Sequence, residues 1–342
     1  MVSFTIFLKK MNNSGNVFQL VSKYRTLLMG IGVIDVFLVH YFNITDIDYN
    51  GGILNILSRI PKLVYTPGFL LLSGFGLFFS FQKSKNLWEF YRKRINRIVI
   101  PFLLISVPFF TVNSLLLHDS FLHYLGNVTT INYWISGNYM AMWYIAVTIV
   151  LYLLYPLLEQ VVIKLKWGGI LTFMLLNIGI HTVSPAYGNS INLALSHTPM
   201  FMLGILMAYY IGQEKHKIQT FLRICVCFAI VSIIVSKLHF VPEYLSLDAM
   251  AMKLIYIPVI CVFFYNLEQN ILVAKLASCL EWLGRYSFEL YVLHVLIYFA
   301  IFKPLLKACY SSNLLILLSI IISLLSCKYI SLGVKRIINC NK

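Results

Sequence analysis

The chain has 342 residues, of which 60% are hydrophobic and 11% are charged, and its mean hydropathy is +0.82. Soluble globular proteins carry roughly 45–50% apolar and about 25% charged residues, so this composition excludes a water-soluble protein and predicts a polytopic membrane protein. The formal net charge of +15 does not predict nucleic-acid binding. Most Lys and Arg residues form short clusters beside apolar runs, which is how a membrane protein is oriented in its bilayer.

The apolar runs predict about ten transmembrane helices in an all-α bundle. A helix needs about 20 apolar residues to cross the hydrocarbon core. We expect a cytoplasmic tail at 1–22, a single transmembrane domain at 23–337 and a short cytoplasmic tail at 338–342. Within the domain, the ten spans are predicted near 26–46, 63–82, 98–117, 142–163, 168–184, 198–213, 219–236, 252–268, 287–303 and 312–333.

The distribution of basic residues predicts the orientation of this bundle. With ten spans, 21 of the 27 Lys and Arg residues fall on one side of the membrane. Cytoplasmic loops carry such an excess of Lys and Arg, so both termini are predicted to be cytoplasmic. The protein is expected to be a multi-pass protein of a cell membrane, either a bacterial inner membrane or a plasma membrane.

The first predicted span contains two titratable residues, Asp35 and His40. A charged group at the bilayer centre costs roughly 2.5–3.5 kcal/mol on insertion scales, so such residues are candidates for function. On a helix, Asn43 shares the face of His40, whereas Asp35 lies about 140° away. His40 is therefore either a neutral, hydrogen-bonded core histidine or a general base, a role that suits imidazole near neutral pH.

The segment between the second and third spans carries a basic cluster that includes Arg94 and Arg97. These two residues are three apart and share one face if the segment is helical. One interpretation is a positive-inside anchor that touches anionic lipid headgroups. The other is a phosphate clamp, because paired guanidinium groups match the geometry of phosphate.

The ninth span carries a polar stripe formed by Ser287, Tyr291 and His294. Their i, i+4, i+7 spacing places them on one face of an otherwise apolar helix. The stripe either holds the bundle together through hydrogen bonds between helices or faces a substrate. The sequence contains no metal-ligand spacing, no Ser/His/Asp arrangement and no nucleotide-binding glycine loop, so neither a metal nor a tightly bound cofactor is expected.

Several blocks of residues resemble the acyltransferase 3 family of integral membrane acyltransferases. The resemblance runs from about residue 23 to 335 and rests on the order and spacing of the blocks. These are the first span ending in His40, Phe69–Phe75, Phe90–Arg97 with Pro101 (similar to the Arg-x-x-Arg element of the family), Met142–Tyr144 leading to Tyr152 and Pro156, Pro199–Gly204, and Leu283–His294 (similar to Gly-x-x-Ser-x-x-x-Tyr-x-x-His).

The chain departs from the family pattern at two positions. Family members commonly carry a basic residue eleven positions before the histidine of the first span, where this chain has Met29. Arg25 lies about one helical turn earlier and is expected to reach the same place. The block in the sixth span often opens with arginine two residues before its proline, and this chain has His197 there.

The resemblance implies transfer of an acyl group, most often acetyl, from acyl-CoA to a hydroxyl of a sugar, polysaccharide or cell-envelope glycan. The implied partners are the acyl-CoA donor, the glycan acceptor and the lipid bilayer. His40 is the implied catalytic base, and Arg94 and Arg97 are expected to bind the phosphates of CoA. The other implied residues are substrate-binding (Ser73, Trp143, Ser287, Tyr291 and His294) or accessory (Arg25, Asp35 and Glu289).

Two other classes of protein fit an intramembrane polar path. One is a transporter or flippase for a lipid-linked glycan, and the other is a ligand-sensing membrane receptor. A flippase would move its substrate without an acyl donor, so dependence on acyl-CoA separates that class from an acyltransferase.

Overall fold

The computed structural model describes residues 17–44, 63–83, 86–136, 142–183, 188–211, 213, 215–237, 247–307 and 309–340. All regular secondary structure in these ranges is helical, and no strand occurs in them. The predicted all-α fold is therefore confirmed for this part of the chain. Residues 1–16 of the predicted N-terminal tail and residues 341–342 of the predicted C-terminal tail lie outside the described ranges.

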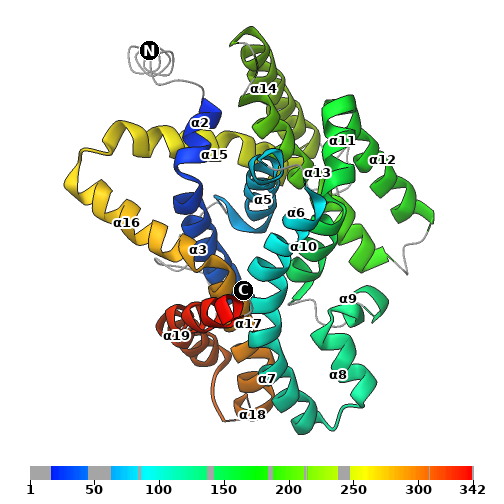
Figure 1. Cartoon of the computed structure of the whole chain (residues 1–342), viewed down its shortest axis with the longest axis vertical. Coiled ribbons are helices and arrows are strands. Elements are labelled where there is room, and N and C mark those ends of the chain that lie inside the picture. Colours follow the sequence, from blue (N-terminus) through cyan, green and yellow to red (C-terminus); the bar gives the residue numbers. More distant parts are fainter. Residues whose placement is uncertain are drawn as a thin grey trace.

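Figure 1 shows how the described helices are arranged. In chain order they are α2 (Val17–Lys23), α3 (Arg25–Ile44), α5 (Tyr65–Gln82), α6 (Leu87–Arg94), the π-helical η1 (Ile95–Val99), α7 (Ile100–Leu117), α8 (Phe121–Val128), α9 (Ile131–Ser136), α10 (Trp143–Leu153), α11 (Tyr155–Leu165), α12 (Trp167–Val183), α13 (Gly188–Ile211), α14 (Lys215–Lys237), α15 (Leu247–Leu267), α16 (Ile271–Arg285), α17 (Ser287–Leu296), the π-helical η4 (Ile297–Phe302), α18 (Lys303–Leu306) and α19 (Ser312–Cys340).

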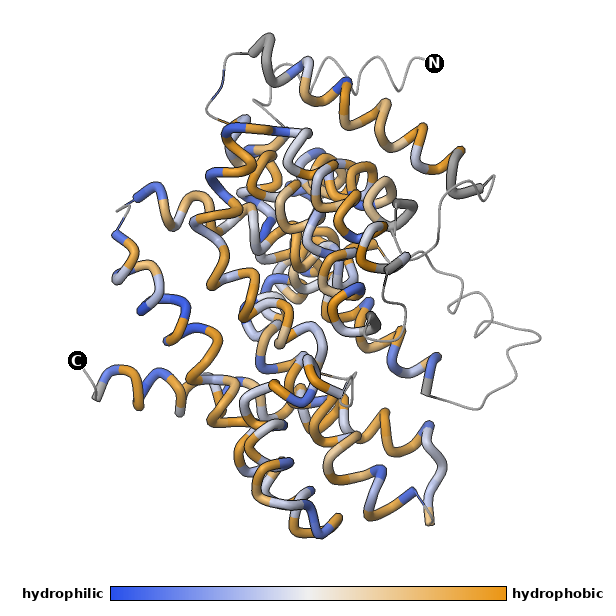
Figure 2. Tube along the Cα trace, turned by 90° about the vertical axis from the view of Figure 1, so that its right-hand side faces the viewer, coloured by the Kyte–Doolittle hydropathy of each residue, from blue (hydrophilic) through white to orange (hydrophobic). Residues whose placement is uncertain are grey.

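Six of the described helical segments are long and apolar enough to cross a membrane, or seven if the bent pair α10 and α11 forms one span. Hydrophobic residues predominate along the helices in Figure 2. The six segments are Arg25–Asn43, Leu87–Leu117, Ser190–Ile211, Met250–Leu267, Ser287–Leu306 and Ser312–Asn339. A multi-pass membrane protein is thus supported, whereas the predicted number of ten spans is not confirmed. The cytoplasmic location of both termini stays a prediction.

The predicted span at 142–163 is broken rather than straight. Its two halves, α10 and α11, meet at an angle of 69°. Pro156 lies at the start of α11, where it lacks the N–H that would bond to the carbonyl of Tyr152 one turn earlier. The Tyr91 hydroxyl donates a hydrogen bond to the Leu153 carbonyl oxygen at 2.8 Å. The bend is therefore tied to the helix that carries the arginine cluster.

Three other predicted spans are not among the six segments, because the helix is too short or lies inside the bundle. The apolar parts of α12 and α14, Trp167–Ile180 and Gln219–Ile234, are shorter than the bilayer requires. Helix α5 is not among the six segments. It lies inside the bundle, with Leu70, Leu71 and Leu72 fully buried, so it needs no continuous apolar face toward lipid.

Several described helices lie outside the ten predicted spans, among them α6, α8 and α9 in predicted loops. Helix α2 falls in the predicted N-terminal tail, and α16 falls between the eighth and ninth predicted spans. Helix α16 packs along α3, and the backbones touch at Gly30 and Gly284. A Cβ atom on Gly30 would lie 1.9 Å from the Leu280 carbonyl oxygen, and one on Gly284 would lie 1.8 Å from that of Thr26.

A second pair of glycines brings α5 into contact with α13. A Cβ atom on Gly74 would lie 2.1 Å from the Phe201 carbonyl oxygen, and one on Gly204 would lie 1.9 Å from the Leu71 carbonyl oxygen. Small residues allow such close approach between transmembrane helices, where dispersion contacts and weak hydrogen bonds drive association. The crossing positions α5, and with it Ser73, in the middle of the bundle.

Replacing Gly204 with alanine should destabilise the protein by about 1–3 kcal/mol, the usual range for an overpacked interior, because the two backbones must move apart. Thermal unfolding of the detergent-solubilised protein measures the effect. Gly179 provides the matched control, since it lies in α12 and a Cβ atom added there would meet nothing within 4 Å. The Gly179→Ala variant should be neutral or stabilised by up to about 1 kcal/mol through helix propensity. Equal melting temperatures for the two variants would contradict the crossing.

An ion pair joins α2 to the end of α15. The Lys23 ammonium lies 2.6 Å from a carboxylate oxygen of Glu268, which also accepts a hydrogen bond from the Tyr24 hydroxyl at 3.0 Å. The hydrogen bond from Lys23 lowers the pKa of the Glu268 carboxyl, and the same bond raises the pKa of Lys23. Both side chains are about half exposed, so solvent screens the pair and limits its contribution to about 1 kcal/mol or less.

The contribution of this pair to stability should depend on pH in a defined direction. A carboxyl with a lowered folded-state pKa stabilises the protein above its unfolded pKa, and this stabilisation disappears as the pH falls through the folded value. The raised pKa of Lys23 keeps the cation present until the pH rises above its ordinary range. Glu268→Gln should therefore lower the melting temperature slightly at about pH 7 and not at about pH 3. A loss of equal size at both pH values would contradict the ion pair as its cause.

Candidate functional site

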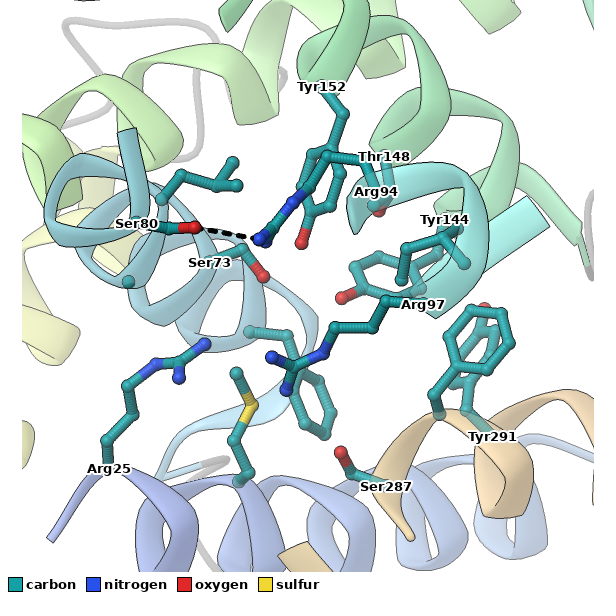
Figure 3. Close-up of a pocket in the computed structure, with 16 residues that line it drawn as sticks. Arg25, Ser73, Ser80, Arg94, Arg97, Tyr144, Thr148, Tyr152, Ser287 and Tyr291 are labelled. Atoms are coloured by element: carbon teal, nitrogen blue, oxygen red, sulfur yellow. Dashed lines mark hydrogen bonds between the residues drawn. The ribbon is translucent and has the colours of Figure 1, made fainter. Parts of the chain in front are cut away.

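A cavity of about 140 Å³ lies between α3, α5, the α6–η1 segment, α10 and α17. Figure 3 shows its lining side chains converging from these elements. The lining combines three arginines, seven hydroxyl groups and six other residues: Arg25, Met29, Phe69, Ser73, Gly76, Leu77, Ser80, Arg94, Arg97, Ile98, Tyr144, Thr148, Tyr152, Ser287, Phe288 and Tyr291. This cavity is the candidate functional site.

Three guanidinium groups point into this cavity (Figure 3). The predicted pair Arg94 and Arg97 comes from the end of α6 and from η1, and Arg25 comes from the start of α3. No carboxylate lines the cavity within the described part of the chain. Glu289 is buried and lies within electrostatic range of Arg97 without lining the cavity. The positive charge of the lining is therefore suited to an anionic ligand.

Two of the arginines are held by specific contacts. The Arg25 Nε donates to the Leu72 carbonyl oxygen at 3.0 Å, and a Cβ atom on Gly76 would lie 2.6 Å from the Arg25 Cζ. A terminal nitrogen of Arg94 donates to the Ser80 hydroxyl at 2.9 Å, and its guanidinium lies 5.4 Å from the centre of the Phe90 ring. The Arg94 Nε is buried with no hydrogen-bond partner among the described residues.

The hydroxyl groups of the cavity come mainly from two helices. Ser73 and Ser80 lie on α5, and Tyr144, Thr148 and Tyr152 lie on α10. The last three follow one another at intervals of four residues, so they occupy one helix face. Tyr144, Thr148, Tyr152 and Ser80 were not among the residues that the sequence singled out for the site. The i, i+4, i+8 pattern of polar residues in an apolar segment was the signal that could have identified three of them.

The polar stripe of α17 follows the cavity and continues beyond it. Ser287 and Tyr291 line the cavity, whereas His294 is fully buried one turn further along. The Tyr291 ring lies 4.9 Å from that of Tyr144 and 5.9 Å from that of His294, measured between ring centroids. Tyr291 therefore connects the cavity wall to His294.

His40 and His294 lie side by side, although 254 positions separate them in the sequence. The His40 Nδ1 is 2.8 Å from the His294 Nε2, and the His294 Nδ1 is 2.7 Å from the Leu290 carbonyl oxygen. The edge of the His294 ring also meets Phe37, with ring centroids 4.8 Å apart. His40 does not line the cavity, so the two predicted parts of the site are joined through Tyr291 and His294.

Arg25 lies far from His40. The two residues are 15 positions apart on α3, which corresponds to about 22 Å along the helix axis. Arg25 and Met29 both line the cavity. Arg25 thus joins the other two arginines, and it does not contact the histidine that the family pattern associates with a basic residue.

Two further residues of the predicted site make other contacts. An Asp35 carboxylate oxygen accepts hydrogen bonds from the backbone N–H groups of Val64 at 2.6 Å and Tyr65 at 3.0 Å. Asp35 therefore caps the N-terminus of α5, as capping side chains do elsewhere. Trp143 does not line the cavity, and its ring lies 4.8 Å from that of His197.

Comparison with known proteins identifies one family. The model of the acyltransferase 3 family, described as an acyltransferase domain, matches residues 26–332. The match covers nearly the whole chain. No curated protein and no solved structure gives a significant match.

Proposed function

Since the chain belongs to the acyltransferase 3 family, we propose that it transfers an acyl group, in particular acetyl, from acyl-CoA to a hydroxyl of a sugar, polysaccharide or cell-envelope glycan. The enzyme would work in a cell membrane, either a bacterial inner membrane or a plasma membrane. The observation that carries the proposal is the convergence of Arg25, Arg94 and Arg97 on one cavity without a lining carboxylate among the described residues.

The charge and the hydroxyl groups of this cavity support an acyl-CoA donor. The phosphate groups of CoA are multiply charged anions, and guanidinium groups bind phosphate with charge-assisted hydrogen bonds. The seven hydroxyl groups of the lining offer additional hydrogen bonds to the polar parts of the donor.

The position of His40 supports a role as the general base. Helix α17 leads from Ser287 at the cavity to His294 beside His40, a distance of about 10 Å along the helix axis. The flexible arm of CoA separates its phosphates from its thioester, so phosphates held by the arginines leave the thioester free to extend toward the histidines.

Direct transfer needs one base and no covalent acyl-enzyme. His40 would remove the proton from the acceptor hydroxyl while its oxygen attacks the thioester carbonyl carbon. The carbon–sulfur bond then breaks, the CoA thiolate leaves, and the proton on His40 neutralises the thiolate. General base catalysis of this kind contributes about 10²–10⁴ in rate.

Release of free CoA from acyl-CoA by the purified protein tests the proposal. The reaction contains acetyl-CoA and a glycan extract of the cell envelope, and the thiol of released CoA is detected with a chromogenic disulfide. We expect release only when donor, acceptor and enzyme are all present. Mass spectrometry of the glycan should show the added acyl mass, about 42 Da for acetyl, which also identifies the acceptor.

The same purified protein, reconstituted into proteoliposomes, tests the alternative function of a flippase. Proteoliposomes that move a lipid-linked glycan between leaflets without acyl-CoA, while no CoA is released, would replace the acyltransferase proposal with transport.

A further inference from the structure

The histidine pair forms a directed chain of hydrogen bonds that ends at a backbone carbonyl. The first contact joins the His40 Nδ1 to the His294 Nε2 at 2.8 Å. The second joins the His294 Nδ1 to the Leu290 carbonyl oxygen at 2.7 Å. Each of these two contacts joins a nitrogen to a nitrogen or oxygen atom. Each is a hydrogen bond only if one proton lies between its two atoms.

The carbonyl determines where these protons lie. A carbonyl oxygen can only accept, so the His294 Nδ1 must carry the proton of the second contact. His294 is fully buried, where a charged imidazolium is costly, so its Nε2 carries no proton. That nitrogen must accept, and the His40 Nδ1 must donate. The neutral His40 ring then has its unprotonated nitrogen at Nε2.

We infer that His294 is a positioning residue that holds His40 in the Nδ1-protonated tautomer and thereby makes the His40 Nε2 the base that takes the acceptor proton. The inference rests on the proposed function, because it specifies how the proposed base is prepared. In other histidine-dependent enzymes a hydrogen-bond acceptor at one ring nitrogen sets the tautomer and orientation in the same way, and its loss reduces turnover strongly.

The two histidines cannot exchange these roles. Both ring nitrogens of His294 are occupied, one by His40 and the other by Leu290, and its side chain is fully buried. His40 is partly exposed, and only its Nδ1 is used in the pair. During the reaction, the acceptor proton adds to the His40 Nε2, the Nδ1 proton continues to bond to His294, and the Nε2 proton passes to the leaving thiolate.

Two substitutions of His294 distinguish the effect of losing the hydrogen bond from the effect of altered packing. His294→Leu keeps an apolar side chain of similar length and removes the acceptor, whereas His294→Gln supplies an amide oxygen that can accept from the His40 Nδ1. We expect His294→Leu to lower kcat about 10–100-fold, the usual effect of an orienting partner, with the KM for acetyl-CoA changed less than about threefold. His294→Gln should recover most of the loss. Binding of CoA to each purified variant reports whether the protein has folded.

His197 provides a matched control. Its Nδ1 also lies close to the carbonyl of the residue four positions earlier, Leu193, at 2.9 Å, and its side chain is buried. Its ring contacts Trp143 rather than a second histidine. His197→Leu should therefore leave kcat within about threefold of the wild type.

Nitrogen-15 NMR of histidine-labelled protein reads the tautomer directly, with the His40 signals assigned by their loss in His40→Ala. We expect a protonated Nδ1 and an unprotonated Nε2 in the wild type and a mixture of tautomers in His294→Leu. A proton on the His40 Nε2 in the wild type, an unchanged kcat in His294→Leu, or equal losses in His294→Leu and His294→Gln would overturn the inference. An active His40→Ala would instead overturn the base in the proposed function, while the tautomer measurement would still test the role of His294.

Discussion

His40→Ala should reduce acyl transfer by about 10²–10⁴-fold, because the reaction would lose its proposed general base. The affinity for acetyl-CoA should change little, since the cavity that contains the arginines does not include His40. The measurements are the initial rate of CoA release at saturating donor and the dissociation constant of CoA. If the variant binds CoA normally but turns over slowly, the defect lies in the chemical step.

Asn43→Ala is the control for this experiment. Asn43 lies on the same helix as His40, three positions later, and is exposed, so its loss should change the rate less than about twofold. Turnover of His40→Ala within about threefold of the wild type would eliminate His40 as the base, provided that both variants are recovered from the membrane in equal amounts.

Replacing Arg94 and Arg97 together with alanine should raise the KM for acetyl-CoA about 10²–10⁴-fold, because two charge-assisted contacts are lost. Charge-assisted hydrogen bonds contribute about 1.5–3 kcal/mol each, and each 1.4 kcal/mol corresponds to a factor of ten in affinity. At saturating donor, kcat should fall much less, because neither residue lies beside the histidine pair. Titration of donor concentration in the CoA-release assay separates the two parameters.

Arg92 and Lys93 provide a matched pair for this test. They lie in α6, the helix that ends at Arg94, and carry the same total charge as the arginine pair. Both are exposed, and neither lines the cavity. Arg92→Ala combined with Lys93→Ala should leave the KM for acetyl-CoA unchanged. If both double variants instead impaired insertion or expression equally and left the KM unaltered, the cluster would be a lipid anchor, the other interpretation that the sequence allows.

The helical fold and the arginine pair could be predicted from local patterns. Apolar runs and low charge identify membrane helices without knowledge of packing. The spacing of Arg94 and Arg97 predicts a shared face, and both line the cavity. Arg25 reaches the same cavity from another helix, and only the packing of α3 against α5 shows this, including the absence of a side chain at Gly76.

The pairing of His40 with His294 could not be predicted from the sequence. Periodicity assigns each residue to a face of its own helix, but it does not say which helices are neighbours when 254 positions intervene. The number of membrane spans could not be predicted for a related reason. Counting apolar residues treats α5 as lipid-facing and α10–α11 as straight, whereas burial of the first and the bend beside Pro156 in the second depend on tertiary packing.

The Leu290 carbonyl determines whether the histidine pair can move protons across the membrane. An amide oxygen is a very weak base and cannot pass a proton onward, so the hydrogen-bonded array that begins at His40 is closed at its far end. A proton taken up during turnover can leave only by the nitrogen through which it entered. Catalysis along this array would therefore carry no current across the bilayer, and its rate would not draw on the transmembrane proton gradient.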